Sequence, residues 1–158
     1  MTTIHRDWLE FLRVLRSEST KFLVIGAHAL AYHVEARITE DLDVFVEPTT
    51  ENARRLHRAL EAFGFGGLIG DAAELATPDR VFMLGEKPWR IDILTGIDGV
   101  SFDEAWSSRV EVDFHGVRVF VIGRDALLEN KRASGRRKDR VDVALLEECG
   151  GDDEPSDA

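Results

Sequence analysis

Two aspartates stand two positions apart in the segment EDLDVFVE, residues 40–47. Aliphatic residues occupy the alternating positions, namely Leu42, Val44 and Val46. This period of two predicts a strand with one aliphatic face and one face that begins with Asp41 and Asp43. Because same-face neighbours on a strand have Cα atoms about 6.6–7 Å apart, both carboxylates can converge on small hard cations such as Mg²⁺. The segment on its own fits a solvated strand face equally well.

A third acid of the same kind occurs in the segment RIDIL, where Asp92 lies between Ile91 and Ile93. The alternation again sends the aliphatic side chains one way and the carboxylate the other. On a strand that neighbours the first, this carboxylate would complete a two-metal site, which holds the attacking and leaving oxygens of a phosphoryl transfer. A solvent-facing position also explains the acid.

The segment VIGAHA places Gly26 between an apolar strand and a helix. Such a junction directs backbone N–H groups and a helix N-terminus at a phosphate. A single glycine at this position also serves as an ordinary tight turn.

Helices that must position these residues are predicted by helical spacing and by capping signals. The expected ranges are 5–17, 27–33, 49–65, 101–106, 124–133 and 137–148. Residues 66–79 are expected to form a loop or a broken helix.

Strands are predicted where apolar and β-branched residues alternate or run together between turn signals. The expected ranges are 21–25, 41–47, 80–84, 89–94, 109–114 and 117–122. Gly85–Pro88 and His115–Gly116 should each close a hairpin. The fold class is therefore α/β (α+β), with a small mixed β-sheet flanked by helices. Residues 1–149 form a single domain, and residues 150–158 form an acidic tail that we expect to be disordered.

The composition is that of a soluble protein, with 158 residues of which 44% are apolar and 32% charged. No apolar run reaches the roughly 18 residues of a transmembrane helix, and the N-terminus lacks the layout of a signal peptide. The single Cys149 can form no internal disulfide and has no zinc-ligand spacing around it. We therefore expect a cytoplasmic protein without a membrane partner.

The formal net charge is −10, whereas the segment KRASGRRKDR, residues 131–140, is strongly basic. An acidic protein of this kind repels polyanions in general but can still bind phosphates at one place. This distribution argues against broad coating of nucleic acids and leaves a specific RNA or a nucleotide open.

Four ordered blocks between residues 21 and 147 resemble the nucleotidyltransferase superfamily of the DNA polymerase β type. VIGAHALAYHVEARITEDLDVFVE resembles its strand, turn and helix followed by Arg-x-Thr-x-Asp-x-Asp, and WRIDIL resembles the later strand with a third carboxylate. LLENKRASGRRKDRVDVALLEE is similar to the ending of the small bacterial branch that includes the AbiEii-type toxin nucleotidyltransferases. The resemblance implies the nucleotidyltransferase fold.

The resemblance also implies a role for each matching acid. Asp41 and Asp43 would ligate Mg²⁺ or Mn²⁺, and Asp92 would be the third carboxylate, as a ligand or as a base. The turn at Gly26 and Ala27 would hold the triphosphate. Ala27 stands where the superfamily usually has Gly or Ser, so this turn lacks a hydroxyl and the freest backbone geometry.

Basic and polar residues complete the set of candidate site residues. Lys131 would approach the phosphates or the incoming acceptor, and Lys138 belongs to the same basic segment. Arg37 and Thr39 would touch the nucleotide, although bracing of the loop before the strand explains them equally well.

The predicted activity is Mg²⁺-dependent transfer of a nucleoside monophosphate from an NTP to an RNA, a protein or a small-molecule acceptor. The resemblance suggests a toxin–antitoxin or phage-defence setting, with a toxin or antitoxin partner. The alternative is a catalytically weak protein of this fold that acts as an antitoxin or as a nucleotide-binding partner. The acidic surface and Ala27 favour the alternative, whereas the presence of all three carboxylates favours the enzyme.

Overall fold

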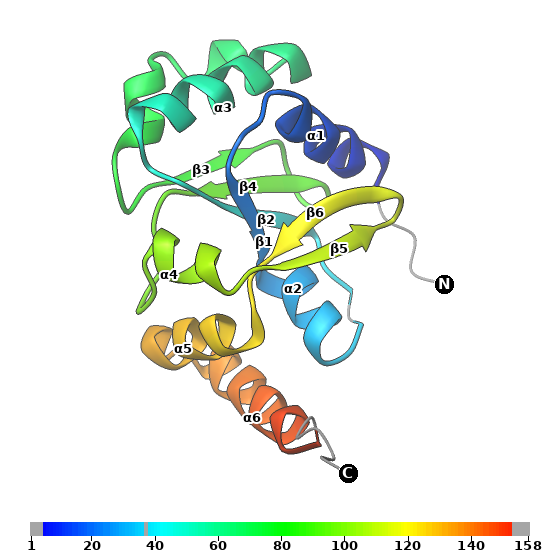
Figure 1. Ribbon diagram of the computed structural model, residues 1–158. Coiled ribbons are helices and arrows are strands. Elements are labelled where there is room, and N and C mark those ends of the chain that lie inside the picture. The colour runs from blue at the N-terminus through cyan, green and yellow to red at the C-terminus, as the bar shows by residue number, and fades with distance from the viewer. Residues whose placement is uncertain (1–4, 37, 153–158) are drawn as a thin grey trace.

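The structure is a computed structural model of the chain, and it describes residues 5–36 and 38–152 (Figure 1). Within these ranges six strands form one mixed sheet in the order β3-β4-β2-β1-β6-β5. The strands are β1 (Phe22–Ile25), β2 (Asp41–Val46), β3 (Val81–Leu84), β4 (Arg90–Leu94), β5 (Val110–Phe114) and β6 (Val117–Val121). The mixed sheet expected from the sequence is therefore present.

The helices are α1 (Arg6–Ser17), α2 (Gly26–His33), α3 (Thr50–Phe63), α4 (Phe102–Ser107), α5 (Arg124–Ser134) and α6 (Arg137–Asp152). In the view of Figure 1, α1 and α3 lie above the sheet, and α2, α5 and α6 lie below it. Residues 66–79, expected as a loop or broken helix, contain two 3₁₀ helices, η1 (Gly66–Leu68) and η2 (Ala72–Ala76). Among the described residues, no helix combines the length and the hydropathy needed to cross a bilayer.

Strand β2 is the centre of the arrangement that positions the acids. It pairs antiparallel with β1 and parallel with β4, and this second pairing places Asp43 opposite Asp92. The hairpins β3–β4 and β5–β6 are antiparallel, as their turn residues predicted. A local hairpin thus brings β4 into the sheet, and a long-range parallel pairing aligns its acid with those of β2.

The aliphatic face of β2 is buried, and Leu42, Val44 and Val46 have no exposed surface. The opposite face is only partly open. Asp41 and Asp43 are half-buried, but Phe45 is covered because its ring packs edge-on against Phe102 of α4, 5.1 Å between centroids. The alternation predicted from the sequence is correct, but α4 limits the open face to the first half of the strand.

Asn52 in the first turn of α3 links three chain segments. Its side chain is buried, accepts a hydrogen bond from the Lys21 backbone N–H (2.7 Å) and donates to the carbonyls of Lys21 and Glu47 (3.0 Å each). These bonds fix the start of β1 against the end of β2, and thereby the register that carries the acids.

The end of α6 differs from the predicted boundary. We expected the last helix to end near residue 148, but α6 continues to Asp152. The rest of the predicted acidic tail, residues 153–158, lies outside the described residues.

Candidate active site

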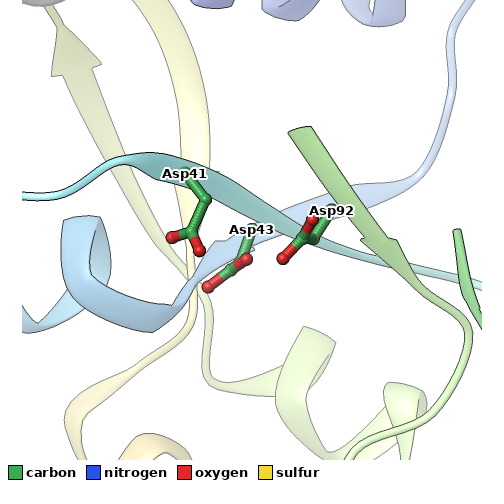
Figure 2. Close-up of side chains that lie close together, drawn as sticks. All are labelled: Asp41, Asp43 and Asp92. Atoms are coloured by element: carbon green, nitrogen blue, oxygen red, sulfur yellow. The ribbon is translucent and has the colours of Figure 1, made fainter. Parts of the chain in front are cut away.

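Three carboxylates from two neighbouring strands converge at one end of the sheet (Figure 2). Asp41 and Asp43 come from β2, Asp92 comes from β4, and each offers an oxygen within 4.8 Å of the others. The structure thus brings together the three acids that the sequence singled out. Such a group of hard oxygen ligands has the chemistry that Mg²⁺ or Mn²⁺ requires.

Gly26 begins α2 directly beside this cluster. Its backbone has a φ of +67°, in the left-handed region, and a Cβ at this position would collide with the Asp43 carboxylate. Only glycine satisfies both conditions without strain. Gly26 also begins α2, so the N–H groups at this helix N-terminus can bind a phosphate beside the acids.

The electrostatics of the cluster centre on Asp43. The pKa of Asp43 is raised to about 7, first by burial and then by repulsion from the charges of Asp41 and Asp92, while Arg90 acts in the opposite direction. At neutral pH this carboxylate therefore holds its proton much more tightly than an ordinary aspartate does. A cluster short of positive charge is suited to a divalent cation.

Arg90, the first residue of β4, is part of the cluster and was missed by the sequence analysis. Its Nε donates to Asp92 Oδ1 at 2.7 Å, and its Nη2 donates to Asp92 Oδ2 at 3.0 Å and to Asp41 Oδ2 at 3.2 Å. A signal was available, because Arg90 and Asp92 are two positions apart and so share a strand face. The guanidinium engages both oxygens of Asp92.

His28, two residues after Gly26, is packed among aromatic rings. Trp8 and Phe114 contact its ring edge-on at centroid distances of 5.2 and 5.4 Å. Burial lowers the pKa of His28 to about 4, although the backbone and the charge of Asp41 raise it in part. His28 is therefore neutral at physiological pH and supports the turn by packing.

The three acids line a cleft of about 570 Å³ that extends to α5 and α6. Gly26, Ala27, Lys131 and Lys138 line it, as do residues that the sequence analysis did not single out, such as Lys87, Asn130 and Arg136. Part of the lining is apolar, because Val81 and Met83 of the edge strand β3 line the cleft and are 52% and 61% exposed. The lining of the cleft therefore combines acidic, basic and apolar residues.

Lys131 lies in the wall of this cleft but is engaged in ion pairs. It is 9% exposed, and its Nζ lies 3.0 Å from Asp139 Oδ1 and 2.9 Å from Asp142 Oδ2. Burial raises the pKa of Asp139, but hydrogen bonds from Ser134 and Lys131 together with nearby charges hold it below its usual value. Lys131 thus joins α5 to α6, a structural role that the sequence analysis did not foresee.

The remaining candidates are placed as follows. Thr39 Oγ1 donates to the backbone carbonyl of Asp41 at 3.0 Å, which agrees with the interpretation that Thr39 braces the start of β2. Arg37 lies outside the described residues.

Comparison with known proteins agrees with this geometry at the level of the fold. No family model and no curated protein matches the sequence. The lincosamide antibiotic adenylyltransferase LnuA, solved with lincomycin bound, superposes with a TM-score of 0.53 at 11% identity, covering 94% of this chain and 99% of that one. An antigenic nucleotidyltransferase-like protein from Paracoccidioides brasiliensis gives 0.53 at 13% identity, covering 94% and 78%. The chain has the nucleotidyltransferase fold.

Proposed function

We propose that this protein is a nucleotidyltransferase that transfers a nucleoside monophosphate from an NTP to an acceptor with Mg²⁺ or Mn²⁺ as cofactor. The observation that carries this proposal is the convergence of Asp41, Asp43 and Asp92 beside the left-handed Gly26 turn. Together with the fold, this arrangement supports phosphoryl-transfer chemistry more directly than a solvated strand face would.

The three acids would hold the divalent metal, which when bound neutralises charge around the transferred phosphate. In the reaction an acceptor oxygen forms a bond to the α-phosphorus, and the bond from that phosphorus to the β-phosphate oxygen breaks to release pyrophosphate. The proton of the acceptor goes to a carboxylate, for which Asp92 is our candidate. The Gly26–Ala27 backbone and the basic wall with Lys138 bind the triphosphate, so that positioning and electrostatics supply the rate enhancement.

Three classes of acceptor are compared for this site: an RNA, a protein and a small molecule. The sequence resemblance to AbiEii-type toxins supports a macromolecular acceptor in a toxin–antitoxin or phage-defence setting. The similarity in fold to a lincosamide antibiotic adenylyltransferase over 99% of that protein supports a small acceptor. The apolar wall at Val81 and Met83 beside Asp92 offers a surface for the apolar part of such a molecule.

The second candidate is an antitoxin or nucleotide-binding partner with this fold and little turnover. One observation favours it, because Arg90 engages both oxygens of Asp92 and one of Asp41. A guanidinium that stayed there permanently would exclude the metal and with it the chemistry.

The proposal is tested by incubating the protein with each α-labelled NTP, Mg²⁺ or Mn²⁺, and acceptor pools of RNA, protein and small molecules. Mass spectrometry should detect one nucleoside monophosphate added to a member of one pool, and Asp41→Asn should abolish the product. Asp125→Asn, which removes a 91% exposed carboxylate, is the matched control and should transfer normally. Product formation that is equal in Asp41→Asn and wild type would exclude the metal mechanism, and inertness of the wild type with every pool would favour the binding role.

A further inference from the structure

Arg90 binds carboxylate oxygens of the acid cluster that a metal would use as ligands. It donates to both oxygens of Asp92 and to one oxygen of Asp41, and its side chain remains 21% exposed to the cleft. A cation that ligates Asp92 must therefore bind an oxygen that already accepts a hydrogen bond from the guanidinium. Metal binding and this ion pair therefore use the same carboxylate oxygens.

The charges make coexistence of the two cations unfavourable. A guanidinium and a divalent ion that share ligands within a few ångströms repel each other, and this repulsion is weakly screened in a half-buried site. If Arg90 simply left the acids, however, its charge would lose its partners. The metal alone would then bind weakly, because part of its binding free energy is used to break the existing ion pair.

A bound nucleotide would give Arg90 an alternative partner in the cleft. Arg90 shares the cleft with the basic residues Lys87, Arg136 and Lys138, whereas the nearby acid Asp139 is already paired with Lys131. A triphosphate that entered this cleft would bring several anionic oxygens, which a guanidinium binds in a bidentate manner.

We propose that Arg90 couples metal binding to nucleotide binding by exchanging partners. It pairs with Asp41 and Asp92 in the free protein, and it moves to the triphosphate when the metal takes these carboxylates. This inference rests on the proposed function and adds to it a residue that makes the metal and the nucleotide bind with positive cooperativity. The coupling is reciprocal, so the metal must strengthen nucleotide binding by the same factor.

The experiment measures Mn²⁺ binding at pH 8 by electron paramagnetic resonance, with and without an α,β-methylene NTP analogue that cannot be cleaved at the reacting bond. In the wild type, Mn²⁺ alone should bind weakly, and the analogue should strengthen binding roughly tenfold or more. In Arg90→Gln, Mn²⁺ alone should bind roughly tenfold more tightly than to the wild type, because the competing cation is gone, and the effect of the analogue should shrink. Arg58→Gln removes an arginine that pairs with Glu18 and should behave like the wild type.

Arg90→Lys is a control for a folding defect in Arg90→Gln, because it retains the positive charge in the cluster. Lysine cannot form the bidentate contact, so the coupling factor of this variant should lie between those of the wild type and Arg90→Gln. Equal coupling in all four proteins would overturn the inference even if nucleotide transfer is observed. Mn²⁺ binding to Arg90→Gln alone would also overturn it and would make Arg90 a permanent replacement for the metal. Absence of Mn²⁺ binding in every protein would contradict both the inference and the proposed cofactor.

Discussion

Replacement of Asp43 by asparagine should stabilise the metal-free protein, and the gain should grow as the pH rises. Asn is uncharged and can donate to Asp92 much as a protonated Asp43 does. The variant therefore keeps the shape of the site while it removes a carboxylate whose ionised form is opposed by burial and by the charges of Asp41 and Asp92.

The magnitude follows from the difference in pKa between the two states of the chain. In the unfolded chain the Asp43 carboxyl ionises near 3.8, and in the folded protein its pKa is raised to about 7. Between these values the folded state holds a proton that the unfolded state has released, so stability falls as the pH rises and levels off above pH 7. From pH 5 to pH 8 the advantage of Asp43→Asn should grow by about 2–3 kcal/mol.

Urea unfolding in EDTA at pH 5, 6, 7 and 8 measures this difference, with Asp125→Asn as an exposed control whose effect should be small at every pH. A constant difference between Asp43→Asn and the wild type over this range would refute the reasoning. A variant less stable than the wild type at pH 8 would show that the carboxylate is stabilised by contacts that its burial and its neighbours do not suggest.

Three further predictions concern the metal, the buried lysine and the turn. Mg²⁺ or Mn²⁺ at about 100-fold excess over its Kd should raise the Tm of the wild type by about 5–10 °C, and Asp43→Asn should lose most of this shift in differential scanning fluorimetry. Lys131→Met should lower the free energy of unfolding by about 3–5 kcal/mol in urea, because it leaves two buried carboxylates without their shared cation; a loss below 1 kcal/mol would show that the pair is dispensable. Gly26→Ala should cost about 1–2 kcal/mol for the left-handed backbone alone and should disturb metal binding through its clash with the cluster, whereas Gly67→Ala, in open space, is the control.

Most of the secondary structure could be predicted from local patterns in the sequence. The alternation in β2 reports which side chains share a face, because the strand itself imposes that period. The turn at His115–Gly116 predicted the β5–β6 hairpin, and both residues have positive φ as such a two-residue turn requires. These features depend on residues close in sequence, which a local pattern can describe.

The arrangement of the site depends on contacts distant in sequence, and these were harder to infer. The alternation in RIDIL predicted that Asp92 points away from its aliphatic neighbours. Only the parallel pairing of β2 with β4 places it opposite Asp43. The burial of Phe45 depends on α4, which comes much later in the chain. Lys131 fitted a basic segment in the sequence, whereas in the fold Asp139 and Asp142 from the next helix surround its ammonium group.

The balance of charge in the cluster argues against a purely structural role for the acids. A strand face that only needed solvation could use Thr or Lys, and it would not keep a half-buried aspartate with a pKa of about 7 beside two other acids. The Gly26 turn adds a second local conflict at the same place, since its backbone is left-handed and approaches Asp43 too closely for any side chain. Unfavourable local features that coincide at one point of a well-packed fold are typical of a binding or catalytic site. Arg90 reduces the repulsion but leaves Asp43 without a hydrogen bond of its own from the guanidinium among the described contacts. The cluster therefore retains a deficit of positive charge that a divalent cation would remove.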